Sequence, residues 1–292
     1  MKPFFKPKAY FRPGSLGKAV ELLSNFGDRA KVLAGGTDLL VQKPSGVECL
    51  IDIADLGLEY IKEHENGVEI GAATTVRSIG VSGSLSSEPY LVLRDAACAL
   101  GTPTIRNMAT IGGNICNASP AADLPLALMV LGASLTIMGP AGKREVNIGE
   151  FFENIGGKNI QADELLLSIN IPASRGRCGT SFQKLRHHQT SIDIAIVNVA
   201  ARMTCEKQAC VKASIALGAV APTPIYARKA EALLGKKRPN AAIIQEAASA
   251  ASEEVNPIDD VRGSKWYRKK MAAVLVRRAL EESSRRCGIW PE

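Results

Sequence analysis

Gly35 and Gly36 stand between two apolar runs in the segment KVLAGGTDLL. The pattern predicts a strand that ends in the two glycines and continues into a helix at Thr37, leaving backbone N–H groups unblocked beside the positive helix N-terminus. Such a corner binds phosphate. It lacks the Lys-Ser/Thr pair of a P-loop and the third glycine of a Rossmann fingerprint. A tight turn capped by Thr37 or Asp38 explains the same residues, so both interpretations stay open.

A second segment, RNMATIGGNICNASPAADLP, repeats this arrangement at residues 106–125. Gly112 and Gly113 allow close approach, and the polar side chains around them are Asn114, Asn117, Ser119 and Asp123. Two Gly-Gly corners suit a ligand with two phosphates, and dense polar side chains suit a ligand edge that needs donors and acceptors, as a flavin pyrimidine ring does. An Asn-rich surface loop with capping roles is the alternative.

The composition predicts an ordinary globular protein of roughly two domains, since the 292 residues are 46% hydrophobic and 22% charged. Gly, Ser and Pro break the longest apolar runs well before the roughly 20 residues of a membrane span. The N-terminal segment has three prolines within MKPFFKPKAYFRPGS and resembles neither a signal peptide nor an anchor. We therefore expect a cytoplasmic protein without a membrane partner.

Seven cysteines without any C-x-x-C pair argue against a disulfide framework and a structural zinc site, so no metal is expected. Cys205 and Cys210 have the C-x4-C spacing that begins an iron–sulfur signature, but the third ligand position, 213, is Ala. We expect both cysteines to be strand residues flanking the hairpin turn EKQA.

The net charge of +7 would suit nucleic-acid binding, but only 5% of residues are aromatic, which leaves little for base stacking. Much of the charge lies in the C-terminal segment 262–286, where Met271, Val274, Leu275 and Ala279 recur at helical spacing and Arg and Lys fill the other face. This pattern favours a solvated or subunit-facing helix over a nucleic-acid partner.

Hydrophobic periodicity and turn residues predict alternating short strands and helices up to residue 172. The segment 102–119 reads as a polar loop, and ASRGRCGTS at 173–181 reads as a linker, which places a domain boundary near residue 176. Beyond it, a long hairpin at 192–220 is followed by three helices. The expected helices are 17–27, 37–43, 90–101 and 121–132, and the expected strands are 30–36, 48–56, 67–76, the hairpin 134–148 and 164–172.

Several segments together resemble a known family: VLAGGTDLL, IGAATTVRSI, GTPTIRNMATIGGNICNASPAADLPLALMVLGA, LLLSINIP and GAVAPTPIYARKAEALLG. They are similar to the FAD-binding medium subunit of the molybdenum hydroxylases, the group of xanthine dehydrogenase and carbon monoxide dehydrogenase. The similarity runs in order from about residue 5 to residue 280, and the TIGGN segment is the specific part.

The resemblance implies an α+β fold with an FAD-binding domain of the p-cresol methylhydroxylase type at 1–175, made of two α/β subdomains at about 1–55 and 56–175. A C-terminal domain of the carbon monoxide dehydrogenase flavoprotein type, with a small antiparallel sheet and helices, would span 177–285.

The resemblance also implies the FAD-contacting residues. The pyrophosphate would lie against Lys31, Val32, Leu33, Ala34, Gly35, Gly36, Thr37, Asp38 and Leu39. The second phosphate and the flavin would lie against Thr110, Ile111, Gly112, Gly113 and Asn114, with Cys116 and Asn117 near the ring or ribityl chain, Asp123 as a hydrogen-bond partner and Leu166 as an apolar neighbour. A flavin-site lysine would be Lys184, unless Gln183 fills that position.

The implied function is electron transfer. A large molybdopterin-binding subunit and a small [2Fe–2S] subunit would perform the hydroxylation, and FAD in this chain would pass electrons onward to NAD+ or another acceptor, such as oxygen or a quinone. No catalytic residue is expected, because hydride transfer needs placement more than a base. Two alternatives stay open: a free-standing FAD-dependent oxidoreductase with its own organic substrate, and a non-catalytic basic binding protein.

Overall fold

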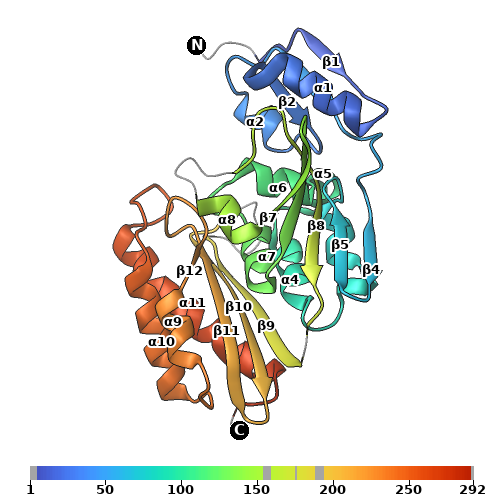
Figure 1. Ribbon diagram of the computed structural model, residues 1–292. Helices are drawn as coiled ribbons and strands as arrows, with labels where there is room; N and C mark the ends of the chain where they lie inside the picture. Colours follow the sequence, from blue (N-terminus) through green and yellow to red (C-terminus); the bar gives the residue numbers. More distant parts are fainter. Residues whose placement is uncertain (1–4, 154–158, 175, 188–193, 291–292) are drawn as a thin grey trace.

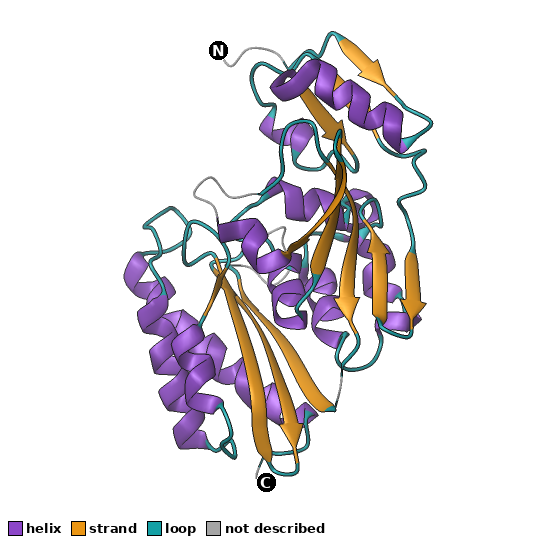
Figure 2. Ribbon diagram, in the orientation of Figure 1, coloured by secondary structure: helices purple, strands orange, loops and turns teal. Residues whose placement is uncertain are grey.

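The computed structural model describes residues 5–153, 159–174, 176–187 and 194–290 (Figure 1). Three sheets succeed one another along the chain, and helices accompany each of them (Figure 2). The mixture of helices with parallel and antiparallel strands confirms the α+β class predicted from the sequence.

The first sheet is parallel and has the strand order β1-β3-β2, from β1 (Ala9–Phe11), β2 (Ala30–Leu33) and β3 (Cys49–Asp52). The helix α1 (Leu16–Phe26) begins where the Ser15 side chain accepts a hydrogen bond from the Lys18 N–H and ends at Gly27, whose φ of 53° a glycine adopts without strain. Its apolar face packs on the sheet. The short elements η1 (Gly27–Arg29) and α2 (Leu39–Gln42) precede and follow β2.

The second sheet is antiparallel and has the order β4-β5-β8-β6-β7. Its strands are β4 (Ile61–His64), β5 (Gly67–Gly71), β6 (Ser134–Gly139), β7 (Gly142–Asn147) and β8 (Leu165–Pro172). The helical elements that accompany it are α3 (Val76–Val81), η2 (Gly83–Leu85), α4 (Leu91–Ala99), α5 (Pro103–Met108), α6 (Ile111–Asn117), α7 (Leu124–Leu131) and α8 (Ile148–Glu153).

The third sheet has the order β12-β11-β10-β9, all antiparallel, from β9 (Arg177–Leu185), β10 (Val197–Glu206), β11 (Ala209–Gly218) and β12 (Ile225–Tyr226). The helices α9 (Arg228–Leu234), α10 (Ala241–Glu254) and α11 (Lys265–Arg286) follow. In Figure 1 these helices lie on the outer side of the sheet, and the second sheet with its helices lies toward its other side.

The helix α7 packs between the second and third sheets. Every residue of its sequence LPLALMVL is buried, so this helix has no solvent side. Ala200 of β10 and Ala216 of β11 belong to the same apolar core as α7, and their small side chains let the third sheet approach it closely.

Two loop predictions are wrong. The segment 102–119, expected to be a polar loop, contains α5 and α6, which begin where the side chains of Thr102 and Thr110 accept hydrogen bonds from the N–H groups of Ile105 and Gly113. The segment 173–181, expected to be a linker, includes the start of β9, because Cys178 to Ser181 pair with β10 and are buried.

Other predicted elements are confirmed, with ends that differ by a few residues. The long hairpin is β10 and β11, Cys205 and Cys210 pair across it, and the three C-terminal helices are present. In α11, Leu275 and Ala279 are buried as predicted, whereas the basic residue Arg268 is buried too. Its guanidinium is neutralised by Asp260 and donates to the carbonyls of Ile196 and Ala219.

The division into domains at 1–175 and 177–285 stays a prediction. No helix in the described ranges combines the length and the apolar character that crossing a membrane requires.

The segment that follows β2 contacts the end of α5 at Gly35. A Cβ atom on Gly35 would lie 1.8 Å from the Met108 carbonyl oxygen and 3.1 Å from Cα of Ala109, so only glycine fits. The two glycine-containing segments of the sequence are therefore neighbours in space.

We expect Gly35→Ala to lower the free energy of unfolding by more than about 2 kcal/mol, because the backbones of residues 35 and 108 must separate. Gly17→Ala is the control, since Gly17 is exposed in α1 and a Cβ there meets nothing within 4 Å; it should stabilise by at most about 1 kcal/mol. Denaturant unfolding measures both, and equal stability of the two variants would contradict the packing role of Gly35.

Candidate functional site

The corner after β2 carries a run of free backbone donors. Among the described residues, the N–H groups of residues 35–39 have no hydrogen-bond acceptor. Gly36 has a φ of 70°, which turns the chain there. Successive free N–H groups at such a turn form an anion-binding concavity, so this corner is suited to a phosphate.

The helix that follows this corner is shorter than predicted. It begins at Leu39 rather than Thr37 and has a single turn, so the free N–H groups rather than a helix dipole supply the positive potential. Asp38 does not cap the helix with its side chain. Asp38 is an exposed residue, yet partial burial of its carboxyl raises the pKa of that group.

The second glycine corner uses its backbone differently. The N–H groups of Ile111 and Gly112 donate to the carbonyls of Thr74 and Ala72, and the Gly113 N–H donates to Oγ1 of Thr110. A Cβ on Gly112 would lie 2.6 Å from the Ala72 carbonyl oxygen. These glycines let α6 pack against the end of β5. The backbone N–H groups that were predicted to face a phosphate therefore already have hydrogen-bond acceptors within the protein.

Side chains of α6 complete this side of the site. The Asn114 Oδ1 atom is buried and has no hydrogen-bond partner, which marks an acceptor that a ligand donor would satisfy. The Asn117 Oδ1 atom accepts a hydrogen bond of 2.9 Å from Nε2 of Gln42, so α6 is tied directly to α2. Cys116 is half-buried against the core. Gln42 was not predicted from the sequence as a residue of this site. The one signal available for it in the sequence was its position about one helical turn after the first corner.

Asp123 and Lys184 form a buried ion pair between the second and third sheets. The Lys184 Nζ atom lies 2.5 Å from Asp123 Oδ2 and also donates to the Ala99 carbonyl, and both side chains are about 95% buried. Asn198, the cross-strand neighbour of Lys184, donates to Asp123 Oδ1 at 2.8 Å. Burial raises the pKa of Asp123, while the Lys184 cation and the Asn198 amide oppose that shift.

Lys184 rather than Gln183 faces the second sheet and its helices. Lys184 lies on the face of β9 that carries Phe182, which packs against the core of the second sheet. Gln183 lies on the opposite face and donates to the Ser181 hydroxyl. The residue order alone could not decide between them.

The remaining predicted residues lie in the framework. Lys31, Val32 and Leu33 belong to β2, Ala34 follows it, and Leu166 is a 3% exposed core residue of β8. The described part of the chain has no group of three His, Cys, Asp or Glu side chains that could hold a metal ion.

The residues brought together fit a dinucleotide cofactor. One side offers free N–H groups for phosphate, and the neighbouring side offers the unsatisfied Asn114 carbonyl. The family models agree with this reading: residues 4–174 match the FAD-binding domain in molybdopterin dehydrogenase, and residues 181–283 match the CO dehydrogenase flavoprotein C-terminal domain.

The chain belongs to the FAD-binding medium subunits of the molybdenum hydroxylases. It is 34% identical over 281 residues to the carbon monoxide dehydrogenase medium chain of Afipia carboxidovorans, covering 95% of this chain and 96% of that one. It is 30% identical over 281 residues to the xanthine dehydrogenase FAD-binding subunit of Escherichia coli O157:H7, covering 94% and 95%.

A solved structure of the carbon monoxide dehydrogenase from Hydrogenophaga pseudoflava matches with a TM-score of 0.92 and 33% identity, over 97% of this chain and 99% of that chain. This medium subunit is therefore an oxidoreductase flavoprotein with FAD as its cofactor, as the resemblance implied. The alternative of a non-catalytic basic binding protein is wrong.

The ion pair yields a test of the contact between the second and third sheets. Asp123→Asn should lower the free energy of unfolding by about 3 kcal/mol, because the Lys184 cation stays buried without a counter-ion. Adding Lys184→Met removes that cation, so the double variant should recover most of the loss. Urea unfolding measures both variants. A double variant as unstable as Asp123→Asn would contradict the role of this pair.

Proposed function

We propose that this medium subunit takes electrons from a [2Fe–2S] partner chain, which receives them from a molybdopterin-binding partner chain, and passes them to NAD+. The observation that carries the proposal is the run of free N–H groups at residues 35–39 together with the unsatisfied Asn114 Oδ1 of α6, in a chain of this family. The relatives named as subunits or medium chains support the existence of partner chains.

The residues of the first corner would hold the FAD pyrophosphate through their backbone N–H groups. The side chains of α6, with Asn114 foremost, would hold the polar part of the cofactor, and the Gln42–Asn117 hydrogen bond would keep α2 and α6 in register around it. Bound FAD supplies a redox centre that accepts electrons singly and releases them singly or as a hydride.

Lys184 would act on the cofactor electrostatically from the third sheet. Because Asp123 matches its charge at 2.5 Å, the pair acts as an oriented dipole rather than a free cation. The chain itself orients the cofactor, excludes water and tunes its potential, which is consistent with the absence of a predicted catalytic base.

An anaerobic redox experiment tests the proposed electron transfer. The FAD-loaded chain is reduced chemically, NAD+ is added, and the flavin absorbance is followed. We expect the oxidised spectrum to return with formation of one NADH per FAD. A reduced flavin that NAD+ leaves unchanged, but that a quinone or oxygen reoxidises, would overturn NAD+ as the acceptor. Reduction of the oxidised chain by an organic substrate without partners would favour a free-standing oxidoreductase.

The Asn114 side chain offers a separate test of cofactor binding. We expect Asn114→Ala to weaken FAD binding about fivefold, the value of one hydrogen bond, without lowering the stability of the FAD-free chain. Asn256→Ala is the control, because the Asn256 side chain is exposed and has no hydrogen-bond partner among the described residues. Fluorescence titration with FAD gives both affinities, and equal affinities would exclude Asn114 from the site.

A further inference from the structure

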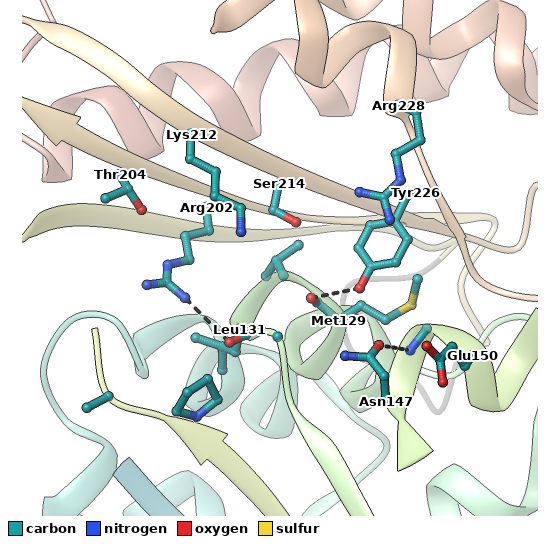
Figure 3. A pocket seen from close by; sticks show the side chains of 15 residues that line it. Met129, Leu131, Asn147, Glu150, Arg202, Thr204, Lys212, Ser214, Tyr226 and Arg228 are labelled. Atoms are coloured by element: carbon teal, nitrogen blue, oxygen red, sulfur yellow. Dashed lines mark hydrogen bonds between the residues drawn. The ribbon is translucent and has the colours of Figure 1, made fainter. Parts of the chain in front are cut away.

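A cavity of about 530 Å³ lies between the second and third sheets (Figure 3). One wall is the end of α7 at Met129–Gly132, with Asn147, Glu150 and the end of β8. The other wall is the open face of β10, β11 and β12, followed by Arg228. We call it the interdomain cleft because its walls lie on either side of the predicted domain boundary. None of its lining residues belongs to either glycine corner, so it is separate from the proposed FAD site.

Four polar side chains form a compact group on the sheet wall. Arg202 of β10 is paired in register with Ser214 of β11, and Thr204 is paired with Lys212. Side chains two residues apart on a strand share a face, and cross-strand pairs lie about 5 Å apart. Figure 3 shows this group on the side of the cleft that faces Met129 and Leu131.

The donors of this group are largely unused. In the described structure, the Lys212 amine and the hydroxyls of Thr204 and Ser214 have no hydrogen-bond partner. Arg202 donates to the Leu131 carbonyl at 3.4 Å and to Ser174 Oγ at 2.9 Å, while its Nε–H is buried without an acceptor. Lys212 is exposed and Thr204 and Ser214 are half-buried, so their donors are open to a ligand from solvent. The Arg202 Nε–H is the buried donor of the group, and its lack of an acceptor costs free energy.

The charge of the cleft is positive. Arg202 and Lys212 have no carboxylate within ion-pair distance among the described residues. Arg228 stacks 3.9 Å from the Tyr226 ring centre and pairs with Glu231, and Glu150 is the single carboxylate among the lining residues. Two uncompensated cations beside two hydroxyls are the donor set that phosphate oxygens accept.

We propose that the interdomain cleft binds a phosphate-bearing small molecule. Its phosphate would lie over the Arg202–Ser214 and Thr204–Lys212 pairs, and the rest of the ligand would lie between the sheet and the end of α7. The volume is in the range of small-molecule sites and exceeds the needs of one phosphate ion. Because the two walls belong to the second and third sheets, such a ligand would also stabilise the contact between these sheets.

Calorimetric titration of the FAD-loaded chain with sodium pyrophosphate and with AMP tests the proposal. We expect saturable one-to-one binding of at least one of them, and about tenfold weaker binding in Lys212→Gln, since a charge-assisted contact is lost. Ser214→Ala should weaken binding less. Lys269→Gln is the matched control, because Lys269 is an exposed lysine of α11 outside the cleft, and it should bind as the parent does.

Absence of saturable binding to the parent chain would overturn the proposal. Equal weakening in Lys212→Gln and Lys269→Gln would overturn it as well, since general charge attraction would then explain the binding. The flavin absorbance of each sample reports FAD loading separately, so failure of the proposed function and failure of the cleft proposal remain distinguishable.

Discussion

The contact between Gly35 and the backbone of Met108 sets the geometry of the cofactor site. A side chain at residue 35 would separate the first sheet from α5 and α6, whereas glycine lets the two backbones meet. This contact places the segment with the free N–H groups of residues 35–39 against the end of α5, and Gln42 reaches Asn117 of α6. The proposed FAD site depends on that approach more than on any single polar side chain.

The sequence allowed the two corners and the long C-terminal hairpin to be predicted, because glycine pairs and alternating apolar residues are local signals. It did not reveal α5 and α6, whose sequences PTIRNM and IGGNICN contain weak helix formers. Threonine caps and packing against the Ala72–Thr74 backbone determine those helices. The sequence also did not show that the two corners differ in their backbone donors. The N–H groups of the first corner are free, whereas those of the second corner donate hydrogen bonds within the protein.

The third sheet illustrates what only tertiary structure decides. Its face toward α7 changes character along the strands: Lys184 and Asn198 hold Asp123 at one end, Ala200 and Ala216 pack in the middle, and cations line the interdomain cleft at the other end. The first part of β9, residues 177–181, was predicted to belong to a linker because its residues are small and polar, yet pairing with β10 makes it a strand. The polar contacts described between the second and third sheets, such as Lys184 with Asp123 and Arg202 with the Leu131 carbonyl, therefore join residues that are far apart in the chain.

Hydrogen exchange of the backbone amides, compared between the FAD-free and FAD-loaded chain, tests the central claim most directly. We predict that FAD slows exchange strongly at residues 35–39, whose N–H groups lack acceptors, and changes it little at residues 111–113, which already donate within the protein. A chain that binds FAD stoichiometrically while residues 35–39 exchange equally fast in both states would contradict the account.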